Sequence, residues 1–113
     1  MHEYSVAAGI ADLVLQHNQG KRVEKVHLNI GAMSGIFYES LEMYLQLILE
    51  EKGHPGVQVP ARFIPASFHC ACGRDYEVEK MVEACPACGG YDRKITGGKD
   101  CEVESIEVED LTA

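Results

Sequence analysis

Four of the five cysteines in this chain occur as two close pairs, and their spacing constrains the fold more than any other feature. The pairs are Cys70-Ala71-Cys72 and Cys85-Pro86-Ala87-Cys88, with 12 residues between them. Two short turns on a hairpin can bring four thiolates around one tetrahedral ion, and zinc is the ion that such a site favours. The sequence therefore predicts a structural zinc site formed by all four cysteines.

The first cysteine pair is less regular than the second. The second pair has the usual two intervening residues, and it is followed by Gly89, which lets backbone amides approach the sulfurs. The first pair has only one intervening residue, and the usual two are restored if His69 replaces Cys70. Two ligand sets therefore remain open, with either Cys70 or His69 joining the other three cysteines.

The rest of the chain has the hydrophobic periodicity of two helices and three strands. Helical spacing covers residues 4–18 and 38–52, whereas alternation covers residues 23–30, 57–63 and 100–109. Pro60 lacks a backbone donor, so its strand is expected at a sheet edge or at a bulge.

The alternation slips in the last predicted strand. Cys101 and Val103 share one face, while Ile106 and Val108 share the other. A β-bulge near Ser105 would bring the two halves onto the same face.

The order of these elements predicts the fold class. We expect an α+β fold, with a small mixed three-stranded sheet, two helices and an inserted zinc-ribbon module. Residues 1–64 and 99–113 would form one α/β domain, and residues 65–98 the zinc-binding domain.

Composition limits the partners and the compartment. The formal net charge is −8, so a phosphate backbone would repel the chain, and we expect no nucleic-acid partner. No apolar run approaches 18 residues and no signal sequence is recognisable, which predicts a cytoplasmic protein without a membrane partner. A reduced compartment favours metal binding over disulfides.

Acidic residues concentrate near the end of the chain. Five of them fall within nine residues: Glu102, Glu104, Glu107, Glu109 and Asp110. We interpret this run as the solvated face of a strand, with a partner-facing or weakly metal-recruiting surface as the alternative.

The first three residues contain a second candidate metal site. The bulk of His2 is expected to protect Met1 from removal, which leaves a free amine next to the His2 imidazole. The amine, the ring and the deprotonated amides of His2 and Glu3 would supply four nitrogens, an array that favours Ni(II) or Cu(II). Glu3 adds a carboxylate. The alternative is a solvated terminus that binds no metal.

Four segments resemble the HypA/HybF family of hydrogenase-maturation nickel chaperones, and with the paired cysteines they span essentially the whole chain. They are Met1–Ala7 (MHEYSVA), Ile30–Gly35 (IGAMSG), Glu39–Leu41 (ESL) and Glu104–Glu109 (ESIEVE). The family normally has two residues between the members of both cysteine pairs, so this chain departs from it at Cys70-Ala71-Cys72.

The resemblance implies a nickel metallochaperone rather than an enzyme. It implies nickel binding at Met1, His2 and Glu3, and zinc in the ribbon at Cys70, Cys72, Cys85 and Cys88. The implied partners are a HypB-type GTPase and the large subunit of [NiFe]-hydrogenase, and urease maturation factors remain open.

Two other classes of function compete with this interpretation. The first is a zinc-ribbon adaptor for protein partners that has no specific nickel site. The second is an enzyme such as a thiol oxidoreductase, which fits poorly because no strand-to-helix turn surrounds Cys85. Four thiolates also leave no open position on zinc for a substrate water.

Overall fold

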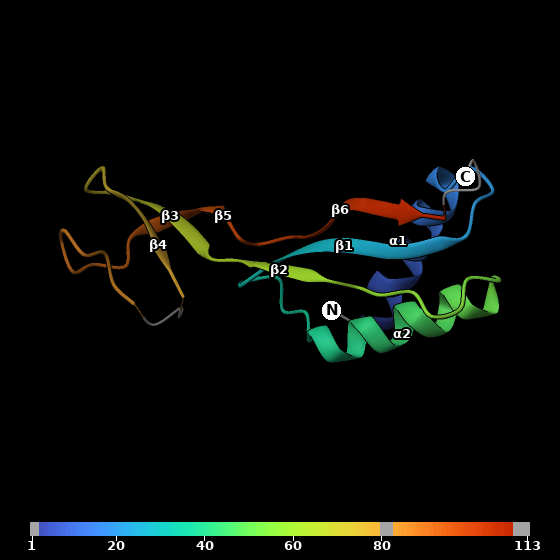
Figure 1. The fold of residues 1–113 in the computed structure, drawn as a ribbon. Helices are drawn as coiled ribbons and strands as arrows, with labels where there is room; N and C mark the ends of the chain where they lie inside the picture. Colours follow the sequence, from blue (N-terminus) through green and yellow to red (C-terminus); the bar gives the residue numbers. More distant parts are fainter. Residues whose placement is uncertain (1–2, 80–82, 110–113) are drawn as a thin grey trace.

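Two separate three-stranded sheets form the framework of an elongated molecule that measures 56 × 29 × 18 Å (Figure 1). The computed structural model describes residues 3–79 and 83–109. The elements in chain order are α1 Glu3–His17, β1 Val23–Gly31, α2 Tyr38–Glu51, β2 Ala61–Ile64, β3 Ala66–Cys70, β4 Asp75–Val78, β5 Arg93–Gly97 and β6 Cys101–Val108. We call α1, α2, β1, β2 and β6 the body, and β3, β4 and β5 with the loops between them the cysteine module.

The body is a two-layer structure in which both helices cover one face of the sheet β2-β1-β6 (Figure 1). β2 runs parallel to β1 and β6 runs antiparallel to it, so the sheet is mixed. The predicted α+β fold class, with two helices and a small mixed sheet, is confirmed.

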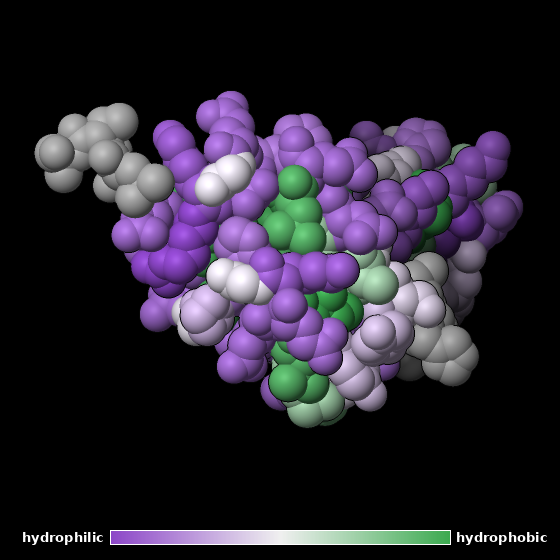
Figure 2. Space-filling model, turned by 90° about the vertical axis from the view of Figure 1, so that its right-hand side faces the viewer, coloured by the Kyte–Doolittle hydropathy of each residue, from purple (hydrophilic) through white to green (hydrophobic). Residues whose placement is uncertain are grey.

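A single hydrophobic core holds the two layers of the body together. Among residues 3–79 and 83–109, thirteen buried residues form it: Ala7, Ile10, Ala11, Val14, Val23, Val26, Leu28, Ile30, Leu41, Leu45, Leu49, Val57 and Val59. Burial of each larger side chain contributes about 1.5–3 kcal/mol before the cost of ordering the chain is subtracted. Figure 2 looks at the end of the body that is far from the cysteine module, and hydrophobic side chains show there in the middle of a hydrophilic surface.

The second strand is shorter than the sequence predicted. The alternation predicted a strand over residues 57–63, whereas β2 covers only Ala61–Ile64. The segment before it runs along β1 with one isolated bridge between Lys25 and Gln58, because Pro60 has no N–H to continue the ladder. The edge position predicted from Pro60 is confirmed, since β2 lies at the end of the sheet.

The last strand contains the predicted bulge. His27 pairs with Ser105 and Leu28 pairs with Val103, which leaves Glu104 as the extra residue of β6. As a result, Cys101, Val103 and Ile106 all pack against the body core.

The cysteine module has its own antiparallel sheet in the order β4-β3-β5, but very little core. Among the described residues, its buried cluster consists of Ala66, Phe68 and Val78. The Arg93 guanidinium covers the Phe68 ring at 4.1 Å from the centroid. Packing alone therefore gives this module much less stabilisation than the body receives.

Backbone hydrogen bonds hold the two junctions between the body and the module against the end of β1. Gly31 N–H donates to Asp100 O, Ala32 N–H to Ile64 O and Met33 N–H to Gly98 O, each at 2.8 Å. A Cβ on Gly31 would lie 2.3 Å from Gly98 O, so only glycine fits there. The Met33 side chain packs against the small core of the cysteine module.

Candidate metal centre

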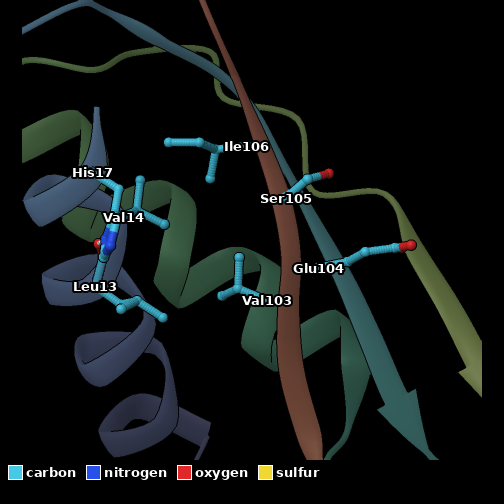
Figure 3. A pocket seen from close by; sticks show the side chains of 7 residues that line it. All are labelled: Leu13, Val14, His17, Val103, Glu104, Ser105 and Ile106. Carbon is cyan, nitrogen blue, oxygen red and sulfur yellow. Dashed lines mark hydrogen bonds between the residues drawn. The ribbon is translucent and has the colours of Figure 1, made fainter. Parts of the chain in front are cut away.

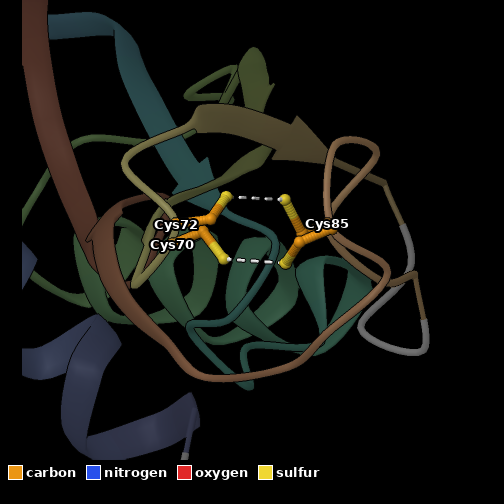
Figure 4. Close-up of side chains that lie close together, drawn as sticks. Cys70, Cys72 and Cys85 are labelled. Carbon is orange, nitrogen blue, oxygen red and sulfur yellow. Dashed lines mark hydrogen bonds between the residues drawn. The ribbon is translucent and has the colours of Figure 1, made fainter.

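The four paired cysteines meet at one point of the cysteine module (Figure 4). Cys70 ends β3, Cys72 follows in the turn to β4, and Cys85 and Cys88 belong to the loop before β5. Their four Sγ atoms all lie within 4.8 Å of one another. The Sγ–Sγ distance is 3.6 Å from Cys70 to Cys88 and 3.7 Å from Cys72 to Cys85.

Two tight backbone turns aim the sulfurs inward. Gly73 N–H donates to Cys70 O and Gly89 N–H donates to Cys85 O, both at 2.8 Å. Gly73 and Gly89 have φ values of +94° and +71°, a left-handed conformation that glycine adopts without steric cost. The glycine after each pair is thus what allows the chain to curl around the sulfurs.

The sulfur positions fit a tetrahedral zinc ion. With Zn–S bonds of about 2.3 Å, neighbouring sulfurs of a regular tetrahedron lie about 3.8 Å apart. The two Sγ–Sγ distances above are close to that value. Soft donors in this array, without an open position, suit structural zinc.

Hydrogen bonds from backbone amides, together with burial, give the cysteine thiols different pKa values. The N–H of Cys88, helped by that of Ala87, lowers the pKa of the Cys85 thiol to about 6. The N–H of Cys72 likewise favours the Cys70 thiolate, but burial and the hydrogen bond with the Cys88 sulfur raise the pKa of Cys70 overall. Four thiolates in such proximity repel one another, so full ionisation requires a bound cation, and metal binding releases protons.

The structure distinguishes between Cys70 and His69. Because side chains alternate along a strand, the two residues project to opposite faces of β3. Cys70 is only 1% exposed and belongs to the sulfur group. The His69 ring is directed elsewhere, with Nδ1 2.6 Å from Asp75 Oδ1. The geometry therefore favours the set of four cysteines, even though one residue separates the first two.

The N-terminal candidate site lies mostly outside the described residues. Met1 and His2, for which nickel binding is predicted, lie outside the residues that the structure describes. Glu3 is the first residue of α1, and its Oε2 accepts a hydrogen bond of 3.3 Å from Phe37 N–H. Phe37 precedes α2 and has no side-chain cap of its own, so Glu3 ties the start of α1 to the start of α2.

Sequence reasoning missed two contacts that connect these regions. One is the hydrogen bond between Glu3 and Phe37, and the other is the packing of Met33 onto the cysteine module. Nothing in the hydrophobic periodicity predicts either contact, because both lie in the loop between β1 and α2. In the described part of the chain, no helix is long and apolar enough to cross a membrane.

The fold and the cysteine group define a small α+β protein with an inserted module that suits structural zinc. The family model described as "Hydrogenase/urease nickel incorporation, metallochaperone, hypA" matches residues 1–108. The chain therefore belongs to the HypA family.

Individual relatives agree with this assignment. The hydrogenase maturation factor HypA of Caldanaerobacter subterraneus subsp. tengcongensis is 35% identical, over 96% of this chain and 100% of the relative. The HypA protein of Azoarcus sp. is 32% identical, over 97% of this chain and 100% of the relative. The solution structure of the nickel metallochaperone HypA from Helicobacter pylori shares the fold, with a TM-score of 0.68, 23% identity and coverage of 96% and 97%. The resemblance found in the sequence motifs is confirmed.

Proposed function

We propose that this chain binds Ni(II) at its N-terminus and delivers it for the maturation of [NiFe]-hydrogenase, while the cysteine module holds one structural zinc ion. The family match over residues 1–108 carries the proposal, because the family is one of nickel-incorporation metallochaperones. Delivery requires a nickel site from which the ion can leave by ligand exchange, and a site at the N-terminus would meet that requirement.

The proposed nickel ligands are supplied by Met1, His2 and Glu3. They comprise the amine of Met1, the imidazole of His2 and the amide nitrogens of His2 and Glu3. Glu3 is the first residue of α1, and the first amides of a helix have no intrahelical acceptor. Loss of the Glu3 amide proton to nickel would therefore break no helical hydrogen bond. The positive end of the helix dipole would also stabilise a deprotonated amide.

The position of the Glu3 side chain supports an additional role in presenting this site. Its carboxylate accepts the Phe37 N–H and so restrains the start of α1 against the start of α2. The carboxylate thereby fixes the position of Glu3, one of the three proposed nickel-binding residues, on the body. Because the imidazole and the amides bind nickel only when deprotonated, affinity should fall as the pH falls.

We assign zinc to Cys70, Cys72, Cys85 and Cys88, with a structural role. The small buried cluster of the cysteine module is too limited to fold without further stabilisation. Zinc would supply the missing folding free energy, and its closed shell would keep it from exchanging with nickel. We place the boundaries of the two domains at residues 64/65 and 98/99.

The proposed partners follow from the family. They are a HypB-type GTPase and the large subunit of [NiFe]-hydrogenase, with urease maturation factors as further candidates. The proposed compartment is the cytoplasm, and the proposed role is metal transfer without catalysis.

Native mass spectrometry of the untagged protein titrated with Ni(II) tests this function. The intact mass should include Met1, and the spectrum should show one zinc and one nickel per chain. His2→Ala should abolish specific nickel binding and retain zinc, whereas His17→Ala, which changes an exposed histidine at the other end of α1, should retain both metals. Zinc alone, or nickel binding that ignores His2→Ala, would refute the N-terminal site and favour a zinc-ribbon adaptor.

A further inference from the structure

β6 is the outermost strand of the body sheet, and within residues 3–79 and 83–109 it pairs only with β1. Its other edge is unpaired along Cys101–Val108. The residues of a strand direct their backbone N–H and C=O groups alternately to the two sides, so this edge presents donors and acceptors to an incoming strand. β6 can therefore serve as the template for a fourth strand.

An apolar groove runs beside this edge, between β6 and α1 (Figure 3). It has a volume of about 340 Å³, and the side chains of Val103 and Ile106 point across it toward Leu13 and Val14. An α-helix with its side chains is about 10–12 Å wide, whereas strands lie about 4.8 Å apart. A helix under the edge strand therefore extends beyond it, and Leu13 of α1 remains 44% exposed.

The opposite face of β6 is acidic. Glu102, Glu104 and Glu107 are exposed. Glu104 also belongs to the lining of the groove, but its side chain is directed away from Val103 and Ile106 (Figure 3). Glu104 lies 3.8 Å from Arg62 and Glu107 lies 2.5 Å from His27, both toward the inside of the sheet. The glutamate side chains remain 49% and 52% exposed, so their oxygens can accept further donors from the open edge.

These features identify the chemistry of the missing strand. Pairing of β6 with a second copy would place glutamates opposite glutamates, and like charges in that position are destabilising. An extended segment with Lys or Arg on the glutamate side and apolar residues on the groove side would satisfy both faces. The net charge of −8 would also attract such a segment from a distance.

We propose that the β6 edge and the α1–β6 groove form a docking site for an extended partner segment in which basic and apolar residues alternate. The segment would add a fourth strand to the sheet, cover Leu13 and neutralise the glutamates of β6. None of its residues is a proposed nickel or zinc ligand, so the docking site does not depend on the proposed nickel function. It assigns a partner-facing role to the acidic run near the end of the chain.

The test uses the zinc-loaded full chain and a labelled ten-residue peptide that alternates lysine with valine or leucine. Fluorescence anisotropy should show binding that weakens between 20 and 300 mM salt, since a shorter Debye length screens the exposed charges. Amide hydrogen exchange should slow in residues 101–108. A peptide of the same composition with lysines and apolar residues in two blocks should bind at least about tenfold more weakly, because it cannot place each type on one face.

Two variants test the two faces separately. The double variant Glu102→Lys/Glu104→Lys should weaken peptide binding about tenfold, and Leu13→Gln should weaken it about fivefold. Glu50→Lys is the control, because Glu50 is also exposed but lies on α2. Circular dichroism and zinc content should stay unchanged in all three. Absence of peptide binding, equal binding of the block peptide, equal loss in Glu50→Lys, or no protection of residues 101–108 would each overturn the docking site.

Discussion

The body and the cysteine module use opposite solutions to the same problem of stability. In the part that the structure describes, the body buries thirteen hydrophobic residues between two helices and a sheet. In its described part, the cysteine module has a hydrophobic cluster of only three buried residues and brings four sulfurs to one point instead. The difference teaches that a sheet of three short strands can be retained in a fold if a metal replaces the core that it lacks.

Removal of the proposed zinc should have the largest effect and should separate the two regions. The cysteine module would lose about 10 kcal/mol or more of binding free energy, whereas the body would keep its core. In ¹⁵N–¹H NMR spectra recorded after chelation, the amides of β3, β4 and β5 should move to unfolded positions, and those of α1 and α2 should remain. Cys88→Ser should act like chelation.

Cys101→Ser is the matched control for Cys88→Ser, because Cys101 lies outside the sulfur group and packs against the body core. It should leave the zinc content at one ion per chain. If the signals of the module stayed dispersed without metal, packing rather than zinc would hold it.

Substitution of Gly31, where the two linkers cross the end of β1, should have the second-largest effect on stability. Gly31→Ala places a Cβ 2.3 Å from Gly98 O and should cost about 4 kcal/mol of unfolding free energy, measured by urea denaturation. Gly9→Ala is the control, because its Cβ meets nothing within 4 Å and alanine favours a helix, so a gain of up to about 1 kcal/mol is expected. Equal stability of the two variants would mean that the linkers do not cross as described.

A core substitution should test the independence of the body. Leu45→Ala removes a fully buried side chain and should lower the unfolding free energy by about 3 kcal/mol while zinc content stays constant. Leu47→Ala, at a position that is 51% exposed, should change it by less than about 0.5 kcal/mol. Loss of zinc in Leu45→Ala would contradict the separation of the two regions.

The smallest effect is expected for the exposed ion pair between His27 and Glu107. A hydrogen bond with His27, together with the charges of Lys25 and His27, lowers the pKa of Glu107 below its ordinary value of 4.5. A lowered pKa stabilises the fold above that ordinary value, and the contribution is lost as the pH falls through the lowered pKa. The difference in Tm between the native protein and His27→Ala should therefore shrink below about pH 4.5.

Acid also weakens zinc binding, but it does so equally in the native protein and in His27→Ala. The difference in Tm between the two proteins at each pH therefore excludes that effect. A difference in Tm that stayed constant down to pH 2 would show that His27 acts through packing and not through Glu107.

Periodicity predicted most of the body. Both helices and the strand at residues 23–30 were placed to within about one residue, and the slip at Ser105 correctly indicated a bulge. These elements are predictable because each one exposes one face and buries the other, which leaves a regular pattern in the residues. The second strand was predicted too long. The hydrophobic alternation continues through Pro60, whereas the ladder of backbone hydrogen bonds is interrupted there.

The candidate metal centre was only partly predictable. The cysteine spacing located the cluster, but it could not choose between His69 and Cys70. That choice depends on which face of β3 each residue occupies and on Asp75, which holds the His69 ring. The crossing at Gly31 was not predicted either, because contacts between distant glycines leave no periodic signal.

The crossing has a consequence for the exchange of modules between proteins. Both linkers leave the body at neighbouring points, and each one is bonded to the residues after β1. A transplanted metal module would therefore need its own Gly98 equivalent in register with Met33, and a host whose Ile64 and Asp100 equivalents bond to Ala32 and Gly31 at the two junctions. The module can therefore be transferred only together with both of its linkers. An insertion of one residue into either linker would shift its backbone hydrogen bonds out of register with the new host.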